Sequence, residues 1–233
     1  MTERTTQAWA RLTGLLLVLT NASAMFAHWV LAQIIVGNDA AGTAANMAAS
    51  ETFVRVGLAA ELDTIAGVIP LIVGLYLVLK PFGRELALLA LSWRLVENCV
   101  LAALAFVSFT ALILVAGGPF MAAADPGQTQ AYVYALMRVH MWGFQFGFLF
   151  LGHGQILFSY LWWKSRYVPR WLAGLGMLAS SVLTLMALGI ILWPPLLSLV
   201  TMAYMAPMGV FEIGLGLWLL IRGVDLGRSE RKD

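Results

Sequence analysis

The stretch LALLALSWRLVENCVLAALAFVSFTALILV, residues 86–115, decides the fold class of this chain. Only two charged side chains, Arg94 and Glu97, interrupt it. A helix needs about 20 predominantly apolar residues to cross the hydrocarbon core of a bilayer. In lipid, only helices and closed barrels satisfy all of their backbone polar groups. The stretch therefore predicts a membrane-spanning helix.

Five further stretches have the same length and character. We predict six transmembrane helices, at residues 12–36, 53–79, 86–115, 137–163, 171–193 and 196–221. Breaks such as Gly117-Gly118-Pro119 and Trp193-Pro194-Pro195 separate them, because proline and glycine do not continue a lipid-exposed helix cheaply. The expected fold is an all-α, polytopic helix bundle, with residues 1–233 forming a single domain.

The composition excludes a soluble globule. Of the 233 residues, 61% are hydrophobic and 11% charged, against about 45–50% and about 25% in soluble domains. A single cysteine, Cys99, excludes an intramolecular disulfide and a multi-thiolate metal site. The net charge of +2 is too small for nucleic-acid binding. We expect the lipid bilayer as the main partner, and self-association is left open.

The distribution of Lys and Arg predicts the orientation, because cytoplasmic loops carry the positive charge. Eleven of the 14 basic residues fall in connections on one side, and the opposite connections contain none. Both termini are therefore expected in the cytoplasm. The eleven are Arg4, Arg11, Lys80, Arg84, Lys164, Arg166, Arg170, Arg222, Arg228, Arg231 and Lys232.

The N-terminal stretch also has features of a secretory signal, with Ala22-Ser23-Ala24 as a cleavage site. Cleavage there would leave residues 25–36, which are too few to cross a bilayer. We therefore interpret residues 12–36 as an uncleaved span.

Ten ionisable side chains fall inside the predicted spans, where such groups are functional candidates by default. Counted along each helix, the groups form two layers. The deep layer lies near mid-membrane and comprises Arg94, Glu97, His153 and Glu212; Asn98 and Gln145 complete the candidate ligand-binding or proton-handling site. The outer layer comprises His28, Arg55, Glu61, Asp63, Arg138 and His140.

Helical spacing predicts the partners in the deep layer. Arg94 and Glu97 are three residues apart on one helix face, as an ion pair or a polar site requires. The side chains of Arg138, Trp142, Gln145, Leu149 and His153 share a stripe that we expect to face inward. Glu212 has no cation within one turn, so its partner must come from another helix. His153, at a matching depth and also flanked by glycines, is the candidate.

The outer layer has plainer explanations as well. Arg55 follows Glu51 by four residues, the spacing of a surface ion pair. No two histidines are three or four residues apart, and no HExxH motif, nucleophile motif or phosphate loop occurs. We therefore expect no metal and no cofactor, and catalysis is not favoured.

Three stretches resemble a known family. They are NDAA at 38–41 with ANMAASE at 45–51 and FVRVG at 53–57; RVH at 138–140 with Gly143-Phe144, Gly152-His153 and Ser165 to Pro169-Arg170; and Phe211-Glu212 running to LLIRG at 219–223. The chain resembles DUF4386, a family of bacterial multi-pass membrane proteins with a domain of unknown function. The resemblance extends from about Leu12 to Gly223 and implies a six-helix domain in the plasma (inner) membrane.

By position, the residues that recur in the family correspond to Arg55, Glu61, His140, His153, Pro169-Arg170 and Glu212. This chain departs from the pattern at two places. Arg166 stands where related chains tend to have a glycine, and Trp142 stands where a smaller or acidic residue is common. The resemblance names no reaction.

Three functions fit these features. The first is binding or translocation of a small molecule or a proton at the deep layer. The second is a non-catalytic partner or sensor subunit that binds another protein, with structural buried charges and adaptable packing from its eleven methionines. The third is an intramembrane enzyme that uses the outer layer for acid-base chemistry.

Overall fold

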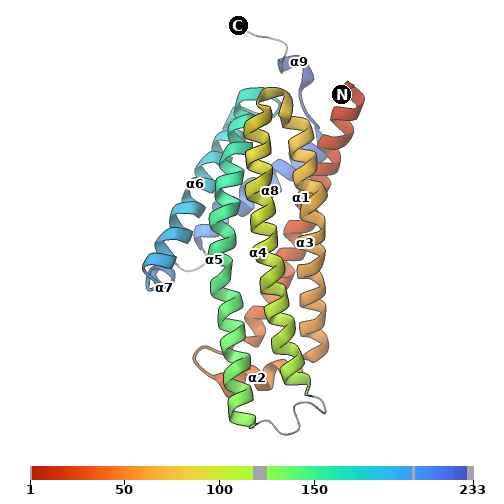
Figure 1. Cartoon of the computed structure of the whole chain (residues 1–233). Helices are drawn as coiled ribbons and strands as arrows, with labels where there is room; N and C mark the ends of the chain where they lie inside the picture. The colour runs from red at the N-terminus through yellow and green to blue at the C-terminus, as the bar shows by residue number, and fades with distance from the viewer. Residues whose placement is uncertain (1, 118–124, 201–202, 230–233) are drawn as a thin grey trace. The chain divides into compact units, whose positions relative to one another are not determined.

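The computed structural model describes residues 2–117, 125–200 and 203–229, and every regular element within them is helical (Figure 1). The all-α prediction is confirmed for this part of the chain. The helices are α1 (Glu3–Ile34), α2 (Ala40–Ala49), α3 (Glu51–Leu79), α4 (Arg84–Ala116), α5 (Pro126–Ser165), α6 (Arg170–Leu192), α7 (Leu196–Val200), α8 (Ala206–Ile221) and α9 (Leu226–Ser229), with 3₁₀ turns at Lys80–Phe82 and Ala203–Met205.

Five segments of the described chain are long and apolar enough to cross a membrane: Glu3–Ile34, Glu51–Phe82, Arg84–Ala116, Arg170–Leu192 and Ala203–Ile221. The protein is therefore a membrane helix bundle. The fourth predicted span lies in α5, whose 40 residues exceed the required length. Helix α5 contains Arg138 as well as histidines and glutamines, and these polar side chains lower the apolar character that a membrane span needs. The six-span count stays a prediction.

The last predicted span, 196–221, is wrong in its first part. Helix α7 ends at Val200, a 3₁₀ turn occupies Ala203–Met205, and α8 begins at Ala206. Pro207 explains the late start, because proline lacks an amide hydrogen and is tolerated in the first turn of a helix but not in its interior. Thr201 and Met202 lie outside the described residues, as do Gly118, Pro119, Arg231 and Lys232.

The predicted outer connection between the first two spans contains a helix. Asp39 caps the N-terminus of α2, where its side chain accepts a hydrogen bond of 2.8 Å from the Gly42 amide. Thr43 and Met47 bury one face of this short helix.

The contacts within the chain divide it into two compact units. Unit 1 comprises residues 1–21, 66–99 and 145–233, and unit 2 comprises residues 22–65 and 100–144. Each of four helices, α1, α3, α4 and α5, is divided between the units, with one part in unit 1 and the other in unit 2. The prediction of a single domain stays a prediction.

Unit 2 has its own apolar core. Leu31 and Ile34 of α1, Met47 of α2, Leu112 of α4 and Met137 of α5 are all buried there. The Tyr134 hydroxyl of α5 donates a hydrogen bond of 2.5 Å to the carbonyl oxygen of Gly37, which ties the α1–α2 connection to α5.

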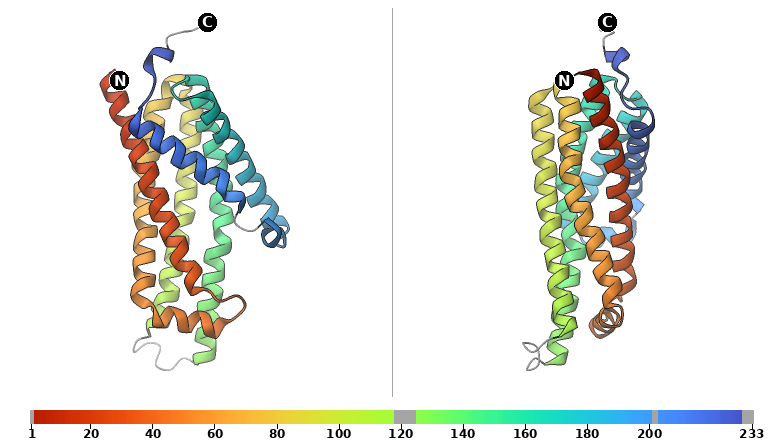
Figure 2. Two further views of the ribbon diagram at one scale, coloured as in Figure 1. Left: turned by 180° about the vertical axis from the view of Figure 1, so that it is seen from behind. Right: turned by 90° about the vertical axis from the view of Figure 1, so that its right-hand side faces the viewer.

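In unit 1, four cation-bearing segments meet at one end (Figures 1 and 2). The Gln7 side chain bonds both the carbonyl oxygen and the amide of Val224. The Asp225 amide donates to the carbonyl oxygen of Tyr167, and the Tyr167 ring packs against that of Phe82 at a centroid distance of 4.8 Å. These contacts hold together the N-terminal segment, the α3–α4 turn, the α5–α6 turn and the segment after α8.

Two glycines allow α1 and α8 to cross closely within unit 1. A Cβ atom on Gly14 would lie 2.5 Å from the Leu220 amide nitrogen and 2.6 Å from the Gly216 carbonyl oxygen. A Cβ on Gly216 would lie 3.1 Å from the Gly14 carbonyl oxygen. Small residues permit such backbone contact between membrane helices.

We expect Gly14→Ala to destabilise unit 1, because the added methyl overlaps backbone atoms that cannot rotate away. Overpacking of this kind costs about 1–3 kcal/mol. Gly209→Ala is the matched control, because a Cβ at Gly209 meets nothing within 4 Å. Unfolding followed by circular dichroism in detergent measures both variants. Equal stability of the two would contradict the close crossing.

Candidate functional site

Two groups of polar and ionisable side chains are buried or partly buried, one in each unit. The Arg94 cluster of unit 1 consists of Asn21, Arg94, Glu97 and Glu212. The Glu61 cluster of unit 2 consists of His28, Glu61, Ser108 and His140. Each cluster draws its members from at least three helices.

Arg94 and Glu97 form the ion pair that their spacing predicts. Arg94 Nη1 lies 3.0 Å from Glu97 Oε2, and the side chains are 5% and 6% exposed. The arginine side chain passes between α4 and α5 because Gly154 leaves room for it: a Cβ there would lie 2.8 Å from Arg94 Cγ. Asn98, one residue beyond Glu97, is also buried.

The pair leaves hydrogen-bonding capacity unused. Arg94 Nε and Nη1 and Glu97 Oε2 are buried and lack a hydrogen bond of good geometry within the described chain. Buried polar atoms are nearly always hydrogen-bonded in folded proteins. These donors and acceptors are therefore able to take a further polar partner.

Glu212 on α8 is bound by a neutral group. It accepts a hydrogen bond of 3.1 Å from Asn21 Nδ2 on α1, while its other oxygen, Oε1, is buried without a partner. No basic nitrogen of the described residues lies within ion-pair distance of Glu212. Of the two carboxyl groups in the cluster, only Glu97 is paired with the guanidinium group of Arg94.

His153 is not the partner of Glu212. Its side chain is exposed, its Nδ1 lies 2.7 Å from the carbonyl oxygen of Leu149 on its own helix, and its ring lies 5.3 Å from that of Trp93. No hydrogen bond or ion pair joins His153 to Glu212 in the described structure. The flanking glycines were misleading, because Gly152 and Gly154 pack against α6 and α4 while the residue between them faces away.

The inward stripe predicted on α5 is also wrong. Of its five members only Gln145 is buried, and it accepts a hydrogen bond of 3.0 Å from the Tyr204 hydroxyl. Other residues of α5 are buried at steps of three, four or seven positions, among them Met137, His140, Gly147, Leu151, Gly154, Phe158 and Leu161. This apolar and small-residue spacing was the better sequence signal for the helix face.

His140 is the centre of the Glu61 cluster. Its side chain is fully buried, and Nδ1 lies 2.9 Å from the carbonyl oxygen of Leu104 and 2.7 Å from Ser108 Oγ. Its Nε2 lies 3.7 Å from Glu61 Oε1. The rings of His140 and His28 pack on Phe144, at centroid distances of 4.9 and 4.7 Å.

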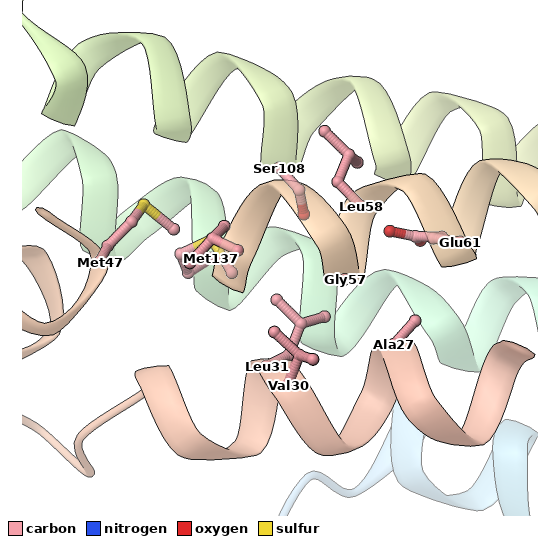
Figure 3. A pocket seen from close by; sticks show the side chains of 10 residues that line it. Ala27, Val30, Leu31, Met47, Gly57, Leu58, Glu61, Ser108 and Met137 are labelled. Atoms are coloured by element: carbon pink, nitrogen blue, oxygen red, sulfur yellow. The ribbon is translucent and has the colours of Figure 1, made fainter. Parts of the chain in front are cut away.

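Two small cavities adjoin Glu61. One, of about 50 Å³, is lined by Glu61 together with His28, Thr64 and Phe144. The other, of about 10 Å³, is lined by apolar side chains together with Glu61 and Ser108 (Figure 3). A cavity must hold about 10–15 Å³ of water-accessible volume to contain one water molecule. The larger cavity therefore has room for water.

The other three members of the outer layer have partners elsewhere. Arg55 pairs with Glu51 at 2.7 Å on an exposed helix face, as the spacing predicts. Asp63 accepts a hydrogen bond of 2.9 Å from Ser23 at the surface. Arg138 lies over the Trp142 ring, 5.7 Å from its centroid. Sequence reasoning missed Ser108, because a serine in an apolar helix carries no distinctive pattern.

The sequence profile of the family described as a domain of unknown function, DUF4386, matches residues 12–223. The chain belongs to this family. No curated protein and no solved structure matches it. The match includes both clusters of this DUF4386 protein and all five apolar helices in whole or in part.

The turn between α5 and α6 contains a strained residue, because Arg166 has a φ of 58°. Glycine enters this left-handed region freely, whereas other residues lose roughly 1–2 kcal/mol there.

We expect Arg94→Met and Glu97→Gln to be non-additive. Loss of one partner leaves a buried charge unpaired, which typically costs about 3–5 kcal/mol. The double variant should lose less than the sum, by about 0.5–3 kcal/mol. The measurement is a double-mutant cycle of unfolding in detergent.

The matched control is the exposed pair Glu51 and Arg55, whose removal should cost about 0–1 kcal/mol. If the losses from Arg94→Met and Glu97→Gln simply add, the two side chains do not stabilise one another.

Proposed function

We propose that this DUF4386 protein binds one positive charge at the Arg94 cluster, either as a proton or as the cationic group of a small molecule. The observation that carries the proposal is the charge balance of the cluster. Arg94 is engaged by Glu97, and Glu212 has only the neutral Asn21 amide as its partner. A carboxylate in a low-dielectric interior requires a compensating charge. A proton or a ligand cation supplies it.

The free atoms of the cluster support the same function. Glu212 Oε1 offers an acceptor to a cationic N–H group, and Arg94 Nε is a second buried atom of the cluster without a hydrogen bond in the described chain. Both atoms are buried, so any bound group loses competing water and gains a stronger interaction. Translocation of the bound charge would begin from this state.

We further propose six spans with both termini in the cytoplasm of a bacterial cell and the chain in its plasma membrane. Helix α5, with 40 residues, supplies the sixth span. The contacts of Gln7, Phe82, Tyr167 and Asp225 gather the basic segments at one end of unit 1, which supports a single cytoplasmic face.

Cysteine labelling tests this topology. In a Cys99→Ala background, Lys164→Cys and Asp125→Cys each place one thiol at an exposed position, one at either end of α5. We expect a membrane-impermeant thiol reagent added to intact spheroplasts to label Asp125→Cys and to spare Lys164→Cys until the membrane is opened. Labelling of both residues from the same side would overturn the topology.

The charge-binding proposal is tested with Glu212→Gln in lipid nanodiscs. The amide has nearly the same shape as the carboxyl group, so the fold should be retained. Infrared spectra recorded over a range of pH should show a protonated carboxyl band in the wild type that Glu212→Gln loses. Glu85→Gln, an exposed acid on α4, is the matched control and should keep the band.

If no such band appears, the bound charge would have to be the cationic group of a small molecule. Small amines should then raise the melting temperature of the wild type but not that of Glu212→Gln. Ethylammonium and choline are suitable probes. Absence of both the band and the thermal shift would show that the cluster is purely structural.

A further inference from the structure

In the second cluster, in unit 2, the hydrogen bonds of His140 fix the tautomer of its imidazole ring. A backbone carbonyl oxygen only accepts hydrogen bonds, so the 2.9 Å contact between His140 Nδ1 and the Leu104 oxygen requires a proton on Nδ1. The Ser108 hydroxyl oxygen, 2.7 Å away, is placed to accept from the same N–H.

With Nδ1 protonated, the neutral imidazole presents a lone pair at Nε2. Nε2 is buried without a hydrogen bond in the described structure, and so is Glu61 Oε1, which lies 3.7 Å away. A movement of about 0.5 Å would bring the two atoms within N–H···O hydrogen-bonding distance. Two acceptors cannot bond one another, so this contact needs a proton.

Glu61 is the natural donor of that proton. Figure 3 shows Glu61 on α3 and Ser108 on the neighbouring α4, with Ala27, Leu31 and Met137 around them. The lining of both cavities is mainly apolar, so a proton shared between Glu61 and His140 leaves no net charge in this low-dielectric environment.

The remaining charged groups of unit 2 do not face the pair. Arg55 is engaged by Glu51, Asp63 by Ser23, and Arg138 lies over Trp142. Asp39 caps α2 and Asp125 bonds the Gln128 amide. The one further titratable group that lines the two cavities is His28, whose Nε2 is buried without a hydrogen bond in the described structure.

We propose that Glu61 and His140 form a proton-binding site, distinct from the Arg94 cluster, in which one proton is shared between Glu61 Oε1 and His140 Nε2. In the transfer step the Oε1–H bond breaks and the Nε2–H bond forms, which converts a neutral pair into a carboxylate and an imidazolium. Leu104 and Ser108 keep Nδ1 protonated throughout. Water in the adjoining cavity of about 50 Å³ is the route by which the proton exchanges with His28.

The test is nitrogen NMR of the full chain with ¹⁵N-labelled histidine in nanodiscs. The chain has only three histidines, so each is assigned by substitution, and exposed His153 is an internal reference. We expect His140 to be protonated at Nδ1, with an Nε2 chemical shift between those of a free lone pair and a full N–H bond, as sharing requires.

Glu61→Gln should move the His140 Nε2 shift toward that of an unprotonated acceptor, since an amide donates a hydrogen bond but does not transfer its proton. Asp63→Asn, on the same helix two residues away, is the matched control and should leave the shift unchanged. Two results would overturn the proposal. One is a His140 ring that is protonated at Nε2 and not at Nδ1, and the other is an Nε2 chemical shift that stays the same in Glu61→Gln.

If Glu61→Gln does not fold, His140→Gln provides a second readout. The infrared band of the Glu61 carboxyl group should then move, because its acceptor changes from imidazole to amide. An unchanged band in His140→Gln would equally refute the shared proton.

Discussion

The cost of placing a charge in a low-dielectric interior is the constraint on which the arrangement of this protein depends. Arg94 and Glu97 meet this constraint on one helix, with Gly154 of α5 making room for the arginine side chain. Glu212 meets it only in part, through a neutral amide from α1. The close crossing at Gly14 and Gly216 brings α1 and α8 into the contact that this hydrogen bond needs.

The two clusters differ in how they lower the cost of placing ionisable groups in a low-dielectric interior. The Arg94 cluster contains one guanidinium group and two carboxyl groups, and the proposed proton or cation would balance the second carboxyl group. The Glu61 cluster contains no fixed cation, and its histidine and carboxyl group become compatible by sharing one proton. Fixed charge favours ligand or ion binding, whereas a neutral acid-base pair favours proton transfer.

Charged residues that look alike in the sequence therefore have different roles. Arg55, Asp63 and Arg138 find partners at exposed or partly buried positions, where an ion pair contributes little to stability. Glu61 and His140 lie in the interior of unit 2. That the chain belongs to DUF4386 does not distinguish these roles, because the family is described only as a domain of unknown function.

The sequence by itself determined the all-α class, the membrane setting, the approximate extent of most spans and the pairing of Arg94 with Glu97. These depend on local properties, namely apolar length and spacing along one helix. Only the tertiary structure decided that Glu212 meets Asn21, that His153 faces outward and that His140 lies at a buried centre with Ser108. Contacts between helices depend on how each helix is rotated about its axis. In a chain whose helices are apolar on nearly every side, the hydrophobic pattern that usually reveals this rotation is weak.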